Sequence, residues 1–128
     1  MNMSYLVAEV LRRGGVAGVV CAPPSALRAG GGATVGVCSW TLTARTKQHA
    51  RWKVGVPVRV ARASCVDAYE AARMCEKAVL AGDWEGIGCG EDVLSLTAAM
   101  PACEGEDSSG LWVWRVDVTV RCEEARGE

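Results

Sequence analysis

The sequence contains no phenylalanine, a single histidine and no two cysteines closer together than ten residues. Any Cys–His nucleophile or His-assisted metal site would therefore have to use His49. Zinc and iron–sulfur sites usually draw on closely spaced cysteines, which this sequence does not offer. We therefore expect no catalytic residue, no metal and no cofactor.

Neither sign of charge dominates, and long apolar runs are absent. Fourteen Lys and Arg residues stand against fifteen Asp and Glu residues, so no overall field favours nucleic acid, an anionic membrane or an acidic substrate. The longest mainly apolar run, residues 14–24, is too short and too glycine-rich to span a membrane. The N-terminal segment has no basic residues ahead of its apolar part and carries Glu9 inside it, which argues against a secretory signal. We expect a cytoplasmic chain without a membrane partner.

What the sequence has instead is valine and alanine. Half of its 128 residues are hydrophobic, and this composition favours a sheet packed by small-residue helices over a large aromatic cofactor pocket. The length predicts one domain over residues 1–128, with a polar tail at 123–128. The odd number of cysteines, seven, predicts reduced thiols that mostly pack as small core residues.

Two segments have helical patterns. Residues 4–13 repeat apolar side chains at helical spacing and are followed by two glycines. Residues 67–81 have Ser64 or Asp67 as N-cap, Gly82 as the C-terminal stop and a stripe of small side chains. The segment between the first helix and the first strand, residues 14–33, is rich in glycine and proline. It is predicted to be an extended, mobile loop, in which V-A-G-V-V-C can form a short strand.

Four segments, residues 35–45, 51–62, 93–100 and 111–122, alternate apolar and polar side chains as strands do. The residues expected to face inward are Cys38, Trp40, Leu42 and Ala44; Val54, Val56, Val58 and Val60; Leu94, Leu96, Ala98 and Met100; and Trp112 and Trp114. Pro57 cannot donate to a ladder, so its strand should lie at an edge or contain a bulge.

The last two strands read as a hairpin with an acidic tip. Together the elements predict an α+β fold in the order α-β-β-α-β-β. Its mostly antiparallel sheet would have four or slightly more strands, with two helices packed on one face.

Several chemical patterns have simpler structural interpretations. His49 lies in the polar connection T-K-Q-H-A, where a solvated turn residue is the simpler reading. The run R-A-G-G-G-A-T-V-G-V leads into a strand and lacks both phosphate-binding glycine motifs. The acidic segment at 104–109 lacks the EF-hand spacing. It is therefore better explained as a soluble hairpin tip.

The charges are distributed unevenly along the chain, with basic residues in the first half and acidic residues after Asp67. Oppositely charged faces let copies of one chain stack head to tail or close into a ring. Trp84, in an acidic loop, is the tryptophan expected at an interface. The residues predicted to take part in assembly are Arg28, Arg59, Trp84, Glu104, Glu106, Asp107, Arg115, Asp117 and Arg121.

Three segments and their order resemble the tail-terminator, or tail-completion, proteins of long-tailed bacteriophages, which are also described as minor tail or minor capsid proteins. They are the helix S-Y-L-V-A-E-V-L-R-R, the strand V-G-V-P-V-R-V-A-R-A with the helix D-A-Y-E-A-A-R-M-C-E-K-A-V-L, and the hairpin from V-L-S-L-T-A-A-M-P to L-W-V-W-R-V-D-V-T-V-R-C. The resemblance spans nearly the whole chain in element order and length. The seven cysteines and the long Gly/Pro-rich segment depart from the family pattern.

The resemblance implies a structural protein and not an enzyme. Such proteins form a ring, usually of six copies, on the head-proximal end of the tail tube, stop tube polymerisation and present a surface to the neck or connector. The expected partners are copies of the chain, the tube protein and neck proteins, with DNA only as cargo passing through the lumen. The expected location is the host cytoplasm during assembly and then the virion.

Three alternatives stay open from the sequence. The chain could be another tail or neck component, such as a tube subunit or a head–tail adaptor. It could be a small cytosolic enzyme with a cysteine nucleophile and His49, or a generic host binding module.

Overall fold

The computed structural model of the chain describes residues 2–21, 32–88 and 90–125. Its elements follow in the order α1 (Met3–Arg13), β1 (Val20–Cys21), β2 (Ala33–Val35), β3 (Ser39–Arg45), β4 (His49–Arg62), α2 (Cys65–Ala81), β5 (Asp92–Ala98), β6 (Ala102–Glu106) and β7 (Trp112–Ala125). The predicted α+β class is confirmed. The predicted sheet of four or slightly more strands and the order α-β-β-α-β-β are wrong, because the described residues form a mixed sheet of seven strands.

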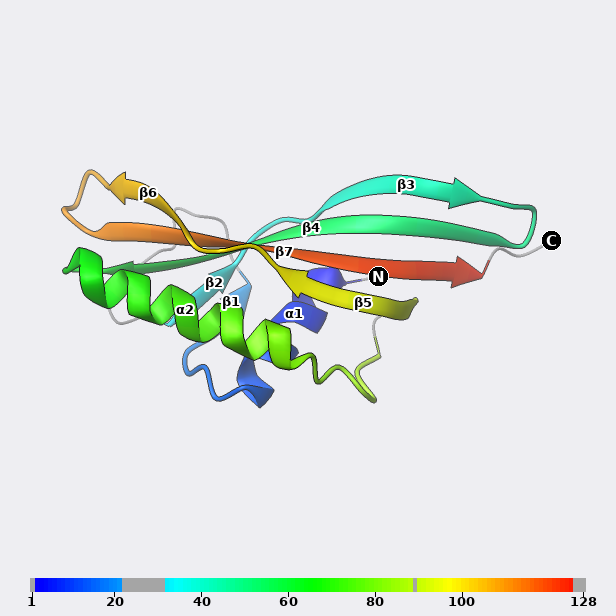
Figure 1. Cartoon of the computed structure of the whole chain (residues 1–128), viewed down its shortest axis with the longest axis horizontal. Coiled ribbons are helices and arrows are strands. Elements are labelled where there is room, and N and C mark those ends of the chain that lie inside the picture. Colours follow the sequence, from blue (N-terminus) through cyan, green and yellow to red (C-terminus); the bar gives the residue numbers. More distant parts are fainter. Residues whose placement is uncertain (1, 22–31, 89, 126–128) are drawn as a thin grey trace.

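Two long strands, β4 and β7, form the centre of the sheet (Figure 1). They pair antiparallel along their whole length, from His49 opposite Ala125 to Arg62 opposite Trp112. On the far side of β4 lie β2 and then β3, and on the far side of β7 lie β6 and β5. β1 pairs parallel with β2. Each long strand therefore has two different short partners along its outer edge.

Pro57 lies in the middle of β4, which is a central strand, so the expectation of an edge strand is wrong. Val35 of β2 pairs with Val58, and Ser39 of β3 pairs with Gly55. Pro57 lies between the part of β4 that pairs with β2 and the part that pairs with β3. Its carbonyl accepts a hydrogen bond from the Gly36 N–H at 2.8 Å. Because the ladder is interrupted at this point, the missing N–H of proline leaves no ladder bond unmade.

The second helix begins and ends at capping residues that the sequence predicts. The first ends at its predicted glycine and begins at Met3, one residue before the expected start. The Asn2 side chain accepts from the Tyr5 N–H at the start of α1. Ser64 caps α2 by accepting from the Asp67 N–H, and Gly82 ends it in the left-handed conformation with φ 65°. That conformation favours glycine because a Cβ atom would crowd the carbonyl.

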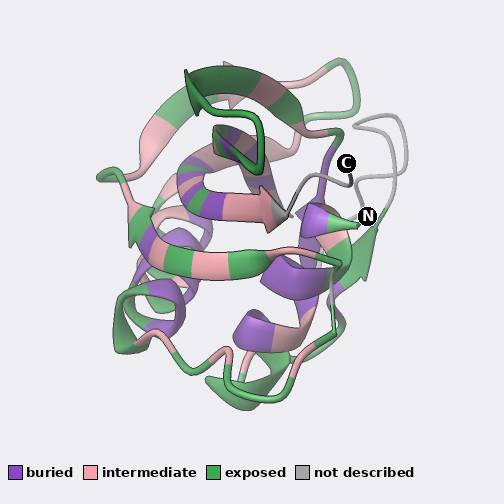
Figure 2. Cartoon of the chain, turned by 90° about the vertical axis from the view of Figure 1, so that its right-hand side faces the viewer, coloured by how far each residue is buried: buried purple, intermediate pink, exposed green. Residues whose placement is uncertain are grey.

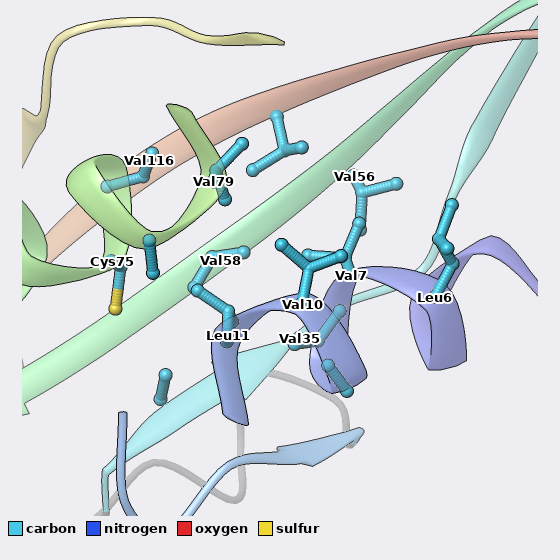
Figure 3. Close-up of a cluster of buried hydrophobic side chains, with 14 of the residues drawn as sticks. Leu6, Val7, Val10, Leu11, Val35, Val56, Val58, Cys75, Val79 and Val116 are labelled. Carbon is cyan, nitrogen blue, oxygen red and sulfur yellow. The ribbon is translucent and has the colours of Figure 1, made fainter. Parts of the chain in front are cut away.

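The helices pack on one face of the sheet and enclose the core (Figure 1). Figure 3 shows Val7, Val10 and Leu11 of α1 lying against Val56 and Val58 of β4. Small residues of α2, among them Cys75, complete the core beside β7. Each fully buried aliphatic side chain of this kind contributes about 1.5–3 kcal/mol.

At the end of the sheet opposite the β6–β7 hairpin lies an arm, defined here as β3, β5 and the parts of β4 and β7 between them, residues 49–55 and 119–125. Its centre still belongs to the core, with Val54, Val120 and Cys122 buried. Several residues predicted to face inward are exposed elsewhere in the arm. Leu42 is 43% exposed and Leu94 51%, and Ala44 is also exposed. Figure 2, viewed from this end, shows buried residues gathered in the helices and the strands facing them. Met100, predicted to face inward, lies outside any strand and is 69% exposed.

Irregular pairing explains part of the error. The ladder between β5 and β7 shifts between Val93 and Ser95. Leu94 is the extra residue of this bulge and has no partner on β7, so the regular alternation does not determine which way it faces. A similar shift occurs in β3 between Leu42 and Ala44. The tryptophans of the last strand are half-buried, and the Trp114 ring packs edge-on against Tyr69 of α2, with ring centroids 4.9 Å apart.

Part of the predicted loop at 14–33 lies outside the described residues. Its described ends contribute β1 and the start of β2. No helix in the described part of the chain is both long and apolar enough to cross a membrane.

Candidate assembly interface

The face of the sheet turned away from the helices, called here the outer face, carries most of the predicted assembly residues. Side chains alternate between the two faces of a strand, and the even-numbered valines of β4 are buried on the helix side. The odd-numbered residues of β4 and β7 therefore form the outer face. The charged ones are Arg51, Lys53, Arg59, Arg115, Asp117, Arg121 and Glu123.

Near the middle of this face, a carboxylate bridges two arginines. Arg59 of β4 is the register partner of Arg115 of β7, and like charges directly opposite each other destabilise a sheet. Glu104 of β6 lies at a bulge between Cys103 and Gly105. Its carboxylate accepts from Arg59 Nε at 2.7 Å and Nη2 at 3.3 Å, and from Arg115 Nη1 at 2.8 Å.

The charges of this cluster balance one another within a single chain. The hydrogen bond from Arg59 is the main reason that the pKa of Glu104 lies below its usual value. Asp117 Oδ1 lies 2.9 Å from Arg115 Nε and completes a group of two cations and two anions. Four predicted assembly residues are therefore brought together, but they bind one another and tie β6 to β4 across β7.

Asp107 holds the tip of the β6–β7 hairpin. Its Oδ1 accepts from the Ser109 N–H and the Leu111 N–H, both at 2.9 Å, and from the Ser109 hydroxyl at 2.7 Å. The bond from Leu111 is the main cause of a lowered pKa at Asp107. This predicted assembly residue therefore has a structural role in the turn, which its D-S-S-G sequence could have indicated.

The remaining predicted residues are scattered. Glu106 is exposed at the end of β6, and Arg121 is exposed on the outer face of the arm. Trp84 is half-buried and packs against the core, which a tryptophan in an acidic loop did not suggest. Arg28 lies outside the described residues.

A second ion-pair group, which the sequence did not indicate, lies at the end of the arm. Glu123 Oε2 accepts from Arg51 Nε at 2.8 Å, and its Oε1 lies 3.3 Å from His49 Nδ1. The bond from Arg51 is the main reason that the pKa of Glu123 is lowered. These residues line an open pocket of about 450 Å³ together with Arg45. The pairing partners lie more than seventy residues apart in the chain, and this separation hid them from sequence reasoning.

The arm ends in two strand edges that no described strand covers. β3 pairs only with β4, and β5 pairs only with β7. Leu42 and Leu94 are the half-exposed leucines of the two edges. The side of β3 is basic, because no acidic residue occurs between Ala33 and Val66. The start of β5 carries Asp92.

The cysteines and the histidine provide no assembled reactive group in the part of the chain that the structure describes. Only Cys75 and Cys122 are buried among the six described cysteines, so the expectation that most are core residues is wrong. Burial raises the pKa of Cys75 to about 11. No three metal-ligating side chains gather among the described residues. The described contacts of the His49 side chain include Glu123 and no cysteine.

Comparison with known proteins gives a likeness of fold. No family model matches the sequence, and no curated protein matches it. Among solved structures, a chain of the virion of a native gene transfer agent (GTA) particle is similar, with a TM-score of 0.58 and 14% sequence identity. The superposition covers 96% of this chain and 92% of that one. The two chains therefore share a fold over nearly their whole lengths.

Proposed function

We propose that this chain is a structural protein of a phage-like virion that acts by assembling with other virion proteins and not by catalysis. Two observations support the proposal. The fold is shared with a chain of a gene transfer agent virion over nearly the full length of both. The residues that sequence analysis associated with assembly lie mostly on one open sheet face and its hairpin tip, and not in an enclosed pocket.

The role that we propose within such a particle is that of a tail terminator. Copies would form a ring, with six as the expected number, at the head-proximal end of the tail tube. The ring would stop tube polymerisation and join the tail to the neck. The chain would assemble in the host cytoplasm and remain in the virion. The observation that supports self-assembly is that the two open edges of the arm, β3 and β5, differ from each other.

The strand directions allow these edges to meet. β3 and β7 are both antiparallel to β4, and β5 is antiparallel to β7. Strand direction therefore alternates across the arm from β3 to β5. Placing β5 of one copy beside β3 of the next continues the alternation as an antiparallel pair. Because the two edges differ, the contact is heterologous, and such a contact generates a ring when its rotation closes.

The side chains of the two edges are also complementary. Arg45 is the partner of Ala50 and Asp92 is the partner of Glu123, so both lie at the outer end of the arm. In the antiparallel arrangement, the basic end of β3 comes beside the acidic start of β5. Leu42 and Leu94, about half exposed in one copy, would both be covered at the contact.

Lysine substitutions at the edges test this proposal. Leu42→Lys and Leu94→Lys each place a charge on one edge, which blocks strand addition. Each variant should stay folded, because the leucine it replaces is already half exposed. The mass in solution should fall from ring to monomer by sedimentation, and negative stain should show no rings on added tail tubes. Val66→Lys, on the exposed side of α2, is the matched control and should leave assembly unchanged.

A mixture of the two variants sharpens the test. Leu42→Lys keeps an intact β5 edge, and Leu94→Lys keeps an intact β3 edge, so one native contact can form between them. We expect dimers that grow no further. A wild-type chain that stays monomeric at high concentration and never joins tail tubes would refute the proposal.

A tube subunit is the second candidate, because the same edges would serve it. A tube subunit stacks ring on ring, whereas a terminator caps a tube after one layer. Negative stain of the purified chain distinguishes the two by whether it forms single rings or long tubes. His49→Ala should leave either assembly intact, which separates both from the enzyme hypothesis.

A further inference from the structure

One pair of cations on the outer face of the arm has no anionic partner. Lys53 of β4 is the register partner of Arg121 of β7, and both side chains are exposed. No described residue forms an ion pair or a hydrogen bond with either side chain. Two like charges directly opposite each other on a sheet repel, so this row disfavours the folded chain.

The same sheet shows how such a row can be neutralised. Arg59 and Arg115 form the second pair of opposed cations, and the carboxylate of Glu104 binds both. At Lys53 and Arg121, the flanking strands supply Thr41 and Ser95 in the corresponding positions. Neither of these residues is an acid. The arm therefore repeats the opposed cations of the Glu104 site without an acid on either flanking strand.

The neighbouring acids do not fill it. Glu123, one row nearer the end of the arm, binds Arg51 and lies beside His49. Asp117, two rows toward the middle, is paired with Arg115. Asp92 is exposed beside Glu123 and forms no ion pair with Arg121 among the described residues. None of these neighbouring acids therefore neutralises the row.

The shape of the row indicates which anion fits. Thr41, Lys53, Arg121 and Ser95 lie side by side on four neighbouring strands, and all four side chains can donate hydrogen bonds. At about 4.8 Å between strands, the row is about 14 Å long. A single carboxylate would contact only part of it. A chain of linked phosphates offers acceptors along the whole row.

We propose that this donor row binds the phosphodiester backbone of a nucleic acid. Two cations in one copy bind a duplex only weakly, because affinity grows with the number of phosphates neutralised. A ring would present one donor row from each copy. The strength of binding therefore rests on the proposed function, because it depends on how many copies the ring contains. The location of the site does not depend on it.

The test is the salt dependence of binding to a short fluorescent duplex DNA, measured by fluorescence anisotropy on the full chain. Each lost phosphate contact lowers the slope of log affinity against log salt by about 0.9. For each copy that contacts the duplex, Lys53→Gln with Arg121→Gln should therefore lower the slope by about 2. Between about 50 and 200 mM salt, the loss of affinity should become about twelvefold smaller than in the wild type.

Two controls accompany this variant. Lys77→Gln removes an exposed lysine of α2 that has no described partner. It should keep the wild-type slope, whereas the matched single variant Lys53→Gln should lower it. Sedimentation of each protein reports whether assembly has changed. If the double variant lowers the slope relative to the wild type but the wild type forms no ring, the donor row still binds DNA and the terminator proposal is contradicted.

Three results would overturn the inference. The wild type binds no DNA at the lower salt concentration, the double variant keeps the wild-type slope, or Lys77→Gln lowers the slope as much as Lys53→Gln. A fourth result would replace it: if the double variant loses assembly while DNA binding is unchanged, the donor row binds a carboxylate of a neighbouring copy.

Discussion

The strands β4 and β7 run through two regions that differ in what covers them. In the helix-covered half, Val56 is 1% exposed and packs beneath α1. In the arm, Leu42 has the same expected inward orientation and is 43% exposed. Alternation along a strand therefore identifies which side chains share a face. It does not identify whether anything covers that face.

The outer face repeats this contrast in its charges. In the helix-covered half, the opposed arginines 59 and 115 are bridged by Glu104. In the arm, the opposed cations Lys53 and Arg121 have no described anion beside them. The helix side of the arm is still buried at Val54, Val120 and Cys122. In the covered half, Glu104 neutralises the opposed arginines, whereas the arm has two open strand edges and an unpaired cation row on its outer face. This difference makes the arm the region where we expect partners.

The largest expected effect comes from placing a charge in each region. Val56→Asp buries a carboxylate without a partner beneath α1. It should cost more than about 4 kcal/mol and leave the chain unfolded. Leu42→Asp places the same group at the open edge and should change the free energy of unfolding by less than about 1 kcal/mol. Circular dichroism during thermal unfolding measures both.

Alanine variants at the same positions guard against a general intolerance of aspartate. Val56→Ala should destabilise the chain clearly and Leu42→Ala only slightly. Equal losses at the two positions would show that the arm is as tightly covered as the helix-packed half, and the comparison would fail.

The second effect tests how closely the covered half is packed. Gly14 follows α1, and a Cβ atom at this position would overlap the Cβ of Ala78 on α2. Gly14→Ala should therefore cost about 1–3 kcal/mol through overpacking. Adding Ala78→Gly should restore part of that loss, as denaturant unfolding of the four proteins in this double-mutant cycle would measure.

Gly88→Ala is the matched control, because no atom lies within 4 Å of a Cβ placed there. It should leave stability nearly unchanged. Independent, additive effects of Gly14→Ala and Ala78→Gly would indicate that the two helices do not meet at this point.

The third effect concerns the bridged arginines and depends on pH. The folded chain lowers the pKa of Glu104, chiefly through the hydrogen bond from Arg59. Its stabilisation is therefore fully present above the unfolded pKa of about 4.3. It is lost as the pH falls through the lower folded pKa. Glu104→Gln should cost about 1 kcal/mol or less at pH 7. This difference from the wild type should disappear in strong acid.

Urea unfolding at a series of pH values measures this difference. Glu70→Gln, at an exposed position on α2 without a described partner, should behave like the wild type throughout. A constant difference between Glu104→Gln and the wild type from neutral to acid pH would show that ionisation of Glu104 does not contribute.

Local signals were sufficient for the helices and for the buried side of β4. Ser64 and Gly82 mark the ends of α2 in the sequence, and the valines 54 to 60 alternate without interruption. Capping and alternation act between residues close together in the chain, so they can be recognised without the fold.

The contacts of the predicted assembly residues could not be recognised without the fold. Glu104 meets Arg59 because β6 bulges beside β7 and β7 pairs with β4, and the contact spans forty-five residues of sequence. The predicted strand at 93–100 corresponds to β5, whereas β6 forms from residues that were expected to belong to the turn. Which edge remains open depends on the strand order, and strand order is a long-range property.

The smallest expected effect lies at the β6–β7 tip, at the opposite end of the sheet from the arm (Figure 1). Asp107→Ala removes the Oδ1 acceptor that binds the Ser109 and Leu111 N–H groups. Hydrogen exchange at these two amides should become faster, while the global free energy of unfolding should barely change, because exposed turns open locally. Ser108→Ala, in the same turn, should leave both amides protected. Unchanged exchange in Asp107→Ala would mean that backbone pairing alone holds the tip, and Asp107 would again be available as an assembly residue.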